Sequence, residues 1–531
     1  VMDSQAMHFQ ARAGAQIANP VLQKALQKAK PLFVGKRAKG MAGLAADGFA
    51  VEALRSACAG IRRRVVDDLD VWLEIFEERA RAGGAEVLWA RDGDEAARLV
   101  VGIARRHGVR TAVKSKSMLS EEARLNEALA AAGIRPVETD LGEYIVQLAG
   151  EAPSHIIAPA VHKTIAEVEA LFAREHCRPA MTRTSADIPT LAGEARTVLR
   201  QHFLAAEMGI SGANFLIAES GSAALVTNEG NGRMVTTLPK VHVVITGIEK
   251  IVPTLEDFAT LMRLLPRSAT GQSISNYVSL LTGTRTAGEP EGPEKTVFIL
   301  VDNGRAALAG SDFADMLRCI RCGACMNHCP VYFSLGGHAY GWVYPGPMGS
   351  VLTPLYTGIE NALALPHAST GCNQCGSVCP VRIPLPGLMH RLREIQDERA
   401  LRPWRERFAL RAWGWLAAHP GPYRWLTRRA ARYLRWLADD SGRIRVLGLA
   451  PGWPSGRALA VNGRVLPSTL HDVRLVAEKG LPFSSRAVRI RGESHISEIK
   501  GKVHQVWLEP NNPPAFPESV QSILQANMII I

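Results

Sequence analysis

The chain has 531 residues, 47% of them apolar and 21% charged, with a formal net charge of +12. This length allows two or three domains with cores of their own, and the composition is typical of a soluble globular protein. No run of about 18 apolar residues is present, so we expect no membrane-spanning helix. Val1 to Lys30 lacks the apolar core of a signal peptide, which favours a cytoplasmic location.

Residues 1–85 are predicted to form a helical N-terminal segment. Within it, 21–30 and 67–82 carry apolar residues three and four positions apart, the period of one helix face.

Residues 86–305 are predicted to form an α/β domain. Short apolar strands are expected at 86–90, 110–113, 134–138 and 155–159, with a helix at 119–132 that is closed by Gly133. Strands that alternate with helices indicate βαβ units and a parallel sheet. Denser strands are expected at 215–219, 223–227, 234–237, 241–246 and 297–301, with a turn at 228–232 between two of them.

Residues 306–400 are rich in Cys, Gly and Pro and lead into a helical pattern from 386 to about 440. Residues 401–457 are predicted to form a basic helical region, and 399–445 contain 12 Arg, no Lys and three acids, together with five Trp. Arg and Trp at helical spacing suit a membrane surface or an acidic partner, and equally a solvated helix with Trp packed inward. No nucleic-acid-binding motif accompanies this charge. Residues 458–531 form a tail of looser composition with no confident domain.

Seven of the nine cysteines lie between Cys319 and Cys379. Without a secretory signal, such a cluster indicates metal or redox chemistry and not disulfides. The two isolated residues, Cys58 and Cys177, are expected to be buried small hydrophobic side chains.

The run Cys319-x2-Cys322-x2-Cys325-x3-Cys329-Pro330 has the spacing of bacterial two-cluster ferredoxins. Three thiolates spaced three residues apart wrap a tight turn around one four-iron cluster. The fourth thiolate, followed by Pro, ligates the other cluster.

A second copy of this run ends at Cys379-Pro380, with Cys375 and Cys372 in register and Ser369 in the first position. Cluster 1 is therefore assigned Cys319, Cys322, Cys325 and Cys379, and cluster 2 is assigned Cys329, Cys372 and Cys375. The fourth iron of cluster 2 would be bound by Ser369, by another oxygen or nitrogen ligand, or by no protein ligand. A three-iron cluster is therefore one of the alternatives.

Structural zinc is the alternative, but zinc takes four ligands at two paired spacings, which seven thiolates with two Cys-Pro endings fit poorly. The aromatic insert between the motifs (His338, Tyr340, Trp342, Tyr344) either shields a cluster or is an ordinary loop.

Each cluster carries one electron at a time, whereas oxidation of an organic substrate removes two, so a flavin or nicotinamide is needed as a bridge. No Gly-x-Gly-x-x-Gly follows a predicted strand, and Gly230-x-Gly232 is expected to be a hairpin turn. The chain is therefore expected to be a subunit of an oxidoreductase complex that does not catalyse alone. We assign no catalytic residue.

Two segments of the α/β domain are candidates for an anion site. Lys114-Ser115-Lys116-Ser117 lies between a strand and a helix, and Glu219-Ser220-Gly221-Ser222 is a tight turn between strands. The alternatives are a simple helix cap for the first and a simple turn for the second.

The chain resembles the lactate utilization protein B family. The resemblance is carried by 22–26 with 33–36, 113–118, 138–145, 153–159, 212–215, 219–222, 301–305 and both cysteine motifs, and it covers roughly residues 8–457.

This resemblance implies an α/β domain similar to sugar isomerases and CoA transferases, a mainly helical domain with two [4Fe–4S] clusters, and the same cluster ligands. It also implies that Ser369 is a family trait. The implied role is electron relay in a complex that oxidises L-lactate to pyruvate and supports growth on lactate. The acceptor would be a quinone or a soluble carrier. A peripheral location at the inner face of the membrane is left open. The alternatives are a subunit of a related glycolate-type oxidase and a redox-sensing anion-binding module. The tail beyond 457 departs from the family and would be an extension, a fusion or a frame-shifted read-through.

Overall fold

The structure is a computed structural model that describes residues 4–176 and 187–437, together with four two-residue strands at 443–444, 459–460, 490–491 and 508–509. Its contacts divide the chain into two compact units, Val1–Pro403 and Trp404–Ile531, and each is described by itself. The expectations for Cys177 and for nearly all of the tail lie outside the described residues.

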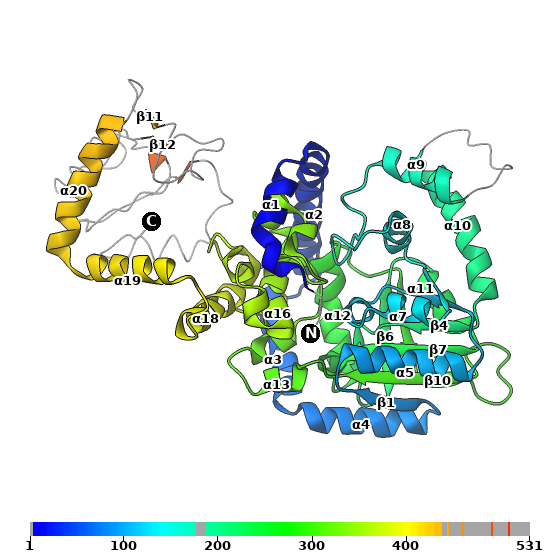
Figure 1. Ribbon diagram of the computed structural model, residues 1–531. Helices are drawn as coiled ribbons and strands as arrows, with labels where there is room; N and C mark the ends of the chain where they lie inside the picture. The colour runs from blue at the N-terminus through cyan, green and yellow to red at the C-terminus, as the bar shows by residue number, and fades with distance from the viewer. Residues whose placement is uncertain are drawn as a thin grey trace. The chain divides into compact units, whose positions relative to one another are not determined.

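A six-stranded parallel sheet forms the centre of the first unit (Figure 1), with strand order β1-β10-β7-β4-β2-β3. Parallel sheets are covered on both faces, and every residue of the apolar strand β7 is buried. One face packs on α5 through Val243 and Ile245, and the other packs on α4 through Val244 and Phe298. The strands are β1 Glu86–Ala90, β2 Thr111–Lys114, β3 Arg135–Glu138, β4 Met208–Ser211, β7 Val241–Gly247 and β10 Lys295–Val301.

A second, four-stranded sheet has the order β8-β5-β6-β9. Its residues Phe215, Ile217 and Val252 share one hydrophobic core with the cysteine-rich part of the chain, so this sheet joins the two domains. Its strands are β5 Phe215–Ile217, β6 Ser222–Thr227, β8 Ile251–Val252 and β9 Tyr277–Leu281.

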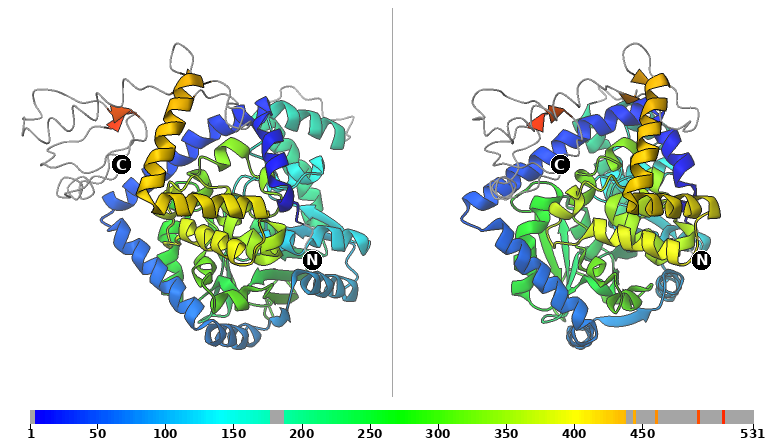
Figure 2. Two further views of the ribbon diagram at one scale, coloured as in Figure 1. Left: turned by 60° about the vertical axis from the view of Figure 1, so that its left-hand side comes forward. Right: turned by 90° about the vertical axis from the view of Figure 1, so that its left-hand side faces the viewer.

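Helices surround both sheets, as predicted for an α/β domain. Figure 2 shows α2 as one long helix that continues through Pro31. The helices are α1 Phe9–Ile17, α2 Pro20–Ala46, α3 Val51–Asp67, α4 Leu69–Ala82, α5 Gly93–Arg106, α6 Met118–Glu122, α7 Leu125–Ala131, α8 Leu141–Ala149, α9 Ile165–Glu175, α10 Ile188–Ala205, α11 Asn231–Thr237 and α12 Leu255–Ala269.

Three expected elements were wrong in detail. The helix expected at 119–132 is divided into α6 and α7, because Arg124 between them has a left-handed backbone with φ of 48°. The strand expected at 155–159 is a loop, in which the His155 ring accepts hydrogen bonds from the backbone of Ile157 (3.0 Å) and Ala158 (3.1 Å).

The third error concerns 234–237, expected to be a strand because Met-Val-Thr-Thr has high strand propensity. These residues belong to α11, whose Val235 is fully buried, so burial of a helix face outweighs local propensity. The turn expected at 228–232 covers only 228–230, between β6 and α11, and Gly232 lies inside the helix, so the hairpin interpretation was wrong.

The cysteine-rich domain is mainly helical, as predicted. Its two motifs repeat one backbone pattern: Arg321 and Gly323 have left-handed φ of 57° and 72°, and the residues 50 positions later, Gly371 and Asn373, have φ of 73° and 57°. Its helices are α13 Arg305–Ala309, α14 Ala324–Asn327, α15 Tyr332–Leu335, α16 Gly346–Thr357, α17 Gln374–Ser377 and α18 Leu385–Glu398.

The second unit contains the helices α19 Trp404–Ala418 and α20 Pro420–Leu437. All five tryptophans of the basic region are exposed, with exposed fractions from 55% to 77%, so none packs inward: Trp404, Trp413, Trp415, Trp425 and Trp436. Among the described helices, none is both long and apolar enough to cross a membrane.

Candidate functional site

Four thiols line one enclosed cavity in the cysteine-rich domain. They belong to Cys319, Cys322, Cys325 and Cys379, which are the four residues assigned to cluster 1 from the sequence. Met348 closes one side, with its sulfur 3.6 Å from the Cys319 Sγ. The thiols therefore surround a space, as a cubane cluster requires when each thiolate binds a different iron.

Backbone geometry places these thiols. Gly323, left-handed after Cys322, turns the chain into α14, which carries Cys325. The backbone N–H of Ile383 donates a hydrogen bond to the Cys379 Sγ at 3.4 Å. Burial, and then the neighbouring Cys379, raises the pKa of Cys322 to about 12. Bound iron would reverse this preference, since a coordinated thiol is deprotonated.

Cys329, Cys372 and Cys375 form the second group. Burial and then the adjacent Cys329 raise the pKa of Cys375 to about 12, and Cys372 also raises it. Cys329 and Cys375 are buried, whereas Cys372 is exposed to solvent. The Cys329 Sγ accepts a hydrogen bond from the Tyr332 backbone at 3.5 Å. The second group thus includes an exposed cysteine, whereas in the first group Cys322 and Cys379 are buried and Cys319 and Cys325 are partly buried.

Ser369 occupies the register position of the eighth thiolate and is half-buried. Its Oγ accepts a hydrogen bond from the Gly371 backbone at 3.2 Å. Across residues 4–176 and 187–437, no three His, Cys, Asp or Glu side chains converge on a point where a single ion would bind.

The aromatic insert lies inside the domain. Tyr340 and Tyr344 are buried, and Tyr340 packs against Tyr332 and Phe9. Burial raises the pKa of Tyr340, and Cys329 and Cys325 raise it further, so this ring lies near both cysteine groups. Shielding of a cluster is the alternative that these contacts favour.

The two candidate anion segments are not brought together. Lys114 is buried and its Nζ pairs with Glu138 (2.6 Å) and Glu121 (2.9 Å), so it stabilises the fold. Its neighbours Ser115, Lys116 and Ser117 instead line a cavity of about 460 Å³.

The turn from Glu219 to Ser222 lies away from this cavity. The Glu219 carboxylate accepts a hydrogen bond from the Leu255 backbone at 2.9 Å, at the start of α12. Gly221 has a φ of 64° and lies so close to Ala80 of α4 that a Cβ would meet its backbone at 2.3 Å. The Ser222 hydroxyl bonds that of Thr282 (2.6 Å), and Ser220 lines no part of the cavity. The structure therefore gives this turn packing and capping contacts.

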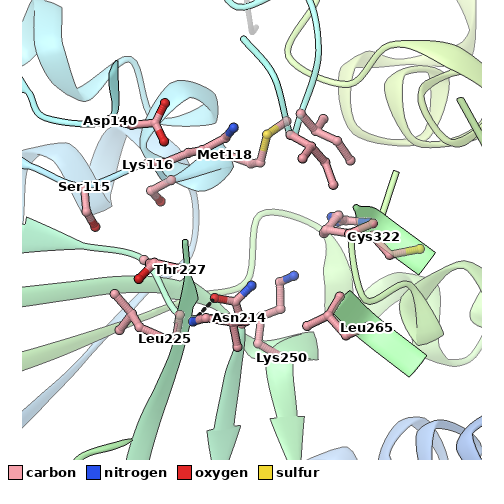
Figure 3. A pocket seen from close by; sticks show the side chains of 18 of the residues that line it. Ser115, Lys116, Met118, Asp140, Asn214, Leu225, Thr227, Lys250, Leu265 and Cys322 are labelled. Atoms are coloured by element: carbon pink, nitrogen blue, oxygen red, sulfur yellow. Dashed lines mark hydrogen bonds between the residues drawn. The ribbon is translucent and has the colours of Figure 1, made fainter. Parts of the chain in front are cut away.

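The 460 Å³ cavity lies at the carboxyl ends of neighbouring parallel strands, where α/β proteins commonly bind ligands. Its opposite wall comes from the cysteine-rich domain and includes Arg321, Cys322 and Tyr344. Figure 3 shows Lys116 and Lys250 extending into the space from different walls, with Cys322 on another side. Cys322 therefore belongs both to this pocket and to the first cysteine cavity.

Buried ion pairs join the two domains beside the pocket. Glu249 pairs with Arg305 (2.6 Å) and Arg321 (3.3 Å), and Arg305 also pairs with Glu122 (2.8 Å). Burial would raise the pKa of Glu249, but the two arginines outweigh it and lower the pKa to about 2. Tyr344 donates a hydrogen bond to Glu122. Sequence reasoning gave Glu122, Glu249 and the two arginines no role, because their partners are far away in the chain, whereas Tyr344 belongs to the aromatic insert named above.

Arg62 of α3 was also missed. It is buried and donates hydrogen bonds to four backbone carbonyls: Ile251 (2.5 Å) and Glu249 beside the sheets, and Leu317 (3.0 Å) and Arg318 (3.4 Å) just before the first cysteine motif.

A parallel α/β domain joined to a helical domain with two groups of ferredoxin-spaced cysteines defines an iron–sulfur protein. Residues 73–301 match the model of the LUD domain and residues 315–383 match the model of the 4Fe-4S dicluster domain. The chain belongs to the lactate utilization protein B family, as the resemblance predicted.

Two relatives match over 452 residues, which is 85% of this chain and 93% of each relative. Lactate utilization protein B of Lysinibacillus sphaericus is 40% identical, and the "uncharacterized electron transport protein YkgF" of Escherichia coli is 39% identical. The lactate utilization protein B of an Exiguobacterium species is 46% identical over 70% of this chain and 78% of its own length. A crystal structure of a DUF162 family protein from Deinococcus radiodurans is 15% identical and covers 44% of this chain and 98% of its own, with a TM-score of 0.23.

Residues 455–531 match the model named 2-phospho-L-lactate transferase CofD.

Proposed function

We propose that this chain is the iron–sulfur subunit of a complex that oxidises L-lactate to pyruvate, in which it relays electrons and supports growth on lactate. The observation that carries the proposal is the enclosed cavity lined by Cys319, Cys322, Cys325 and Cys379. Membership of the lactate utilization protein B family supports the substrate, since several relatives carry that name.

We infer two [4Fe–4S] clusters, with Cys319, Cys322, Cys325 and Cys379 on cluster 1 and Cys329, Cys372 and Cys375 on cluster 2. When bound, each cluster would take up and release one electron at a time. The chain's own part is to hold the thiolates. Backbone N–H groups of Ile383 and Tyr332 stabilise negative charge on Cys379 and Cys329.

The fourth ligand of cluster 2 is inferred to be Ser369 or a non-protein ligand. Ser369 has the right place in the motif, and its hydroxyl already accepts one hydrogen bond, which leaves it an acceptor lone pair.

Electrons are proposed to enter near cluster 1 and leave near cluster 2. Cys322 borders the pocket of the α/β domain, and the exposed Cys372 lies at the surface. A partner subunit of the complex that docks at Cys372 would therefore reach cluster 2 before cluster 1.

A second proposed contact is with the membrane surface, where a quinone-linked acceptor would be reached. The exposed tryptophans of α19 and α20 suit the interface between lipid headgroups and chains, and α20 contains five Arg and no acid. Sedimentation with vesicles of anionic lipid tests this contact, with neutral vesicles as the control. No binding to anionic vesicles would exclude it.

The test of the proposed function is anaerobic purification with a count of iron and zinc, EPR spectroscopy, and reconstitution with the partner subunits. We expect about eight iron atoms and two four-iron signals. If cluster 2 has three irons, we expect one four-iron signal and one three-iron signal. We also expect L-lactate to reduce the clusters in the complex. Zinc without iron would overturn the cluster assignment, and reduction by glycolate but not by lactate would overturn the substrate.

A further inference from the structure

Two lysine amines in the 460 Å³ pocket make no direct ion pair with the described residues, although Glu249 acts electrostatically on Lys250 and Glu229 on Lys116. Lys116 follows β2 and Lys250 precedes β8, and both line the pocket. Within residues 4–176 and 187–437, neither amine has an ion pair or a hydrogen bond to another residue. Holding two unpaired cations at one cavity costs free energy, which a bound anion would recover.

The carboxylates in the same wall are already engaged. Asp140 accepts hydrogen bonds from the backbone of Gly142 (3.1 Å) and Glu143 (3.2 Å) as the cap of α8. Glu249 is paired with two arginines, and Glu229 accepts a hydrogen bond from the Asn231 side chain at 3.1 Å. The charged residues that line the pocket are four cations and three carboxylates, a formal net charge of +1, and the two lysines are the cations without a direct partner among the described residues.

Two buried hydroxyls in the wall also lack partners. The Oγ of Ser115 and the Oγ1 of Thr246 make no hydrogen bond within the described residues, although these side chains are 5% and 2% exposed. Both residues line the pocket. A buried hydroxyl without a hydrogen-bond partner costs free energy. The two hydroxyls therefore point to a polar ligand that forms hydrogen bonds with them.

The remaining wall is suited to an organic body. Apolar side chains line it, and its volume lies in the range of pockets that bind ligands larger than simple ions. The apolar members include Phe33, Met118, Ile156, Ile157, Leu225 and Leu265. Cys322 borders the same space, so a ligand there would lie next to a cysteine assigned to cluster 1.

We propose that this pocket binds an organic anion, whose carboxylate or phosphate group lies between Lys116 and Lys250 and whose body lies along the apolar wall toward Cys322. The link to cluster 1 rests on the proposed function, whereas anion binding itself does not. The pocket thereby forms the substrate-side or cofactor-side end of the electron path.

Calorimetry on the anaerobically purified full chain tests this proposal with four probes: L-lactate, pyruvate, flavin mononucleotide and inorganic phosphate. We expect one organic probe to bind at one molecule per chain. Binding of L-lactate or pyruvate would identify a carboxylate ligand, and binding of flavin mononucleotide would identify a phosphate ester. The K116M and K250M variants should each weaken binding at least about tenfold, the value of one lost charge-assisted contact. The K240M variant, which changes an exposed lysine outside the pocket, should bind as the parent does.

Thermal unfolding separates a ligand-binding lysine from a structural one. Without ligand, K250M should unfold at the same or a higher temperature, because it removes an unpaired charge. A marked fall in its unfolding temperature with unchanged binding would overturn the proposal. Absence of binding by every organic probe at millimolar concentration, or equally tight binding of inorganic phosphate, would also overturn it. These outcomes leave the iron count and EPR signals untouched, so failure here is distinguishable from failure of the relay.

Discussion

The two cysteine groups use one backbone pattern in two different surroundings. The first group has four thiols around an enclosed cavity that borders the α/β pocket, whereas the second has three and reaches solvent at Cys372. Repetition of the motif therefore does not make the two sites equivalent. Burial disfavours the extra negative charge of a reduced cluster, whereas solvent stabilises that charge. The reduction potential of the first cluster is therefore expected to be the lower one, which fits the proposed electron flow from the first group to the second.

The largest expected effect is on metal content and stability, with C322A and C372A as the matched pair. Each should remove about half of the iron, but C322A should also lower the unfolding temperature by about 10 °C, since metal binding is coupled to folding. C372A, at the surface, should unfold close to the parent. Iron analysis and thermal unfolding measure both, and equal loss of stability would contradict the contrast.

The next effect is on resistance to oxidation. A mild oxidant should convert the second cluster to a three-iron form while the first keeps its EPR signal, because the second has the exposed Cys372 and is short of a thiolate. S369C should suppress this loss by supplying the eighth thiolate. T370C adds a thiol one residue out of register and serves as the control. Loss of iron from the first cluster before the second would refute the proposed difference in access.

A smaller effect is expected in the reduction potentials. An EPR-monitored redox titration should give two midpoints, with the more negative one belonging to the first cluster. Assignment follows from C372A, which should retain only the more negative midpoint. If it retained the more positive one, the inferred direction of electron flow would be reversed.

The smallest effect concerns the second of the two left-handed residues in each motif, Gly323 and Asn373. G323N should destabilise the fold by about 1 to 2 kcal/mol, because a Cβ there would meet the Ile157 side chain at 3.2 Å. N373G should change the free energy of unfolding by no more than about 0.5 kcal/mol, since glycine adopts this φ readily. Urea unfolding of both variants measures the difference, and equal costs would show that the two turns are packed alike.

Much of the fold and the cysteine groups could be predicted because the signals are local. Thiolate spacing is a property of a few consecutive residues, and the buried strands β7 and β10 are nearly continuous apolar runs. The cluster ligands themselves stay a prediction, since no metal is part of the structure. Residues 234–237 were misassigned because strand propensity was read without the burial that decides it.

The pocket could not be predicted, because it collects residues from distant parts of the chain. Phe33, Lys116, Lys250 and Cys322 meet only through tertiary packing. Of the eight residues proposed for an anion site, Ser115, Lys116 and Ser117 line the cavity, and anion binding there stays a prediction. Lys114, the last residue of β2, is instead buried and paired with Glu138 and Glu121, which come from other elements of the fold.

Arg62 has a consequence for how the relay works. A single guanidinium holds carbonyls of the sheet region and of the segment entering the first cysteine motif, and removing either set would leave part of this buried cation without acceptors. The cysteine-rich domain therefore does not swing between donor and acceptor, as a tethered carrier would. The distance that electrons must cross between the α/β pocket and the cysteine groups is therefore fixed when the chain folds.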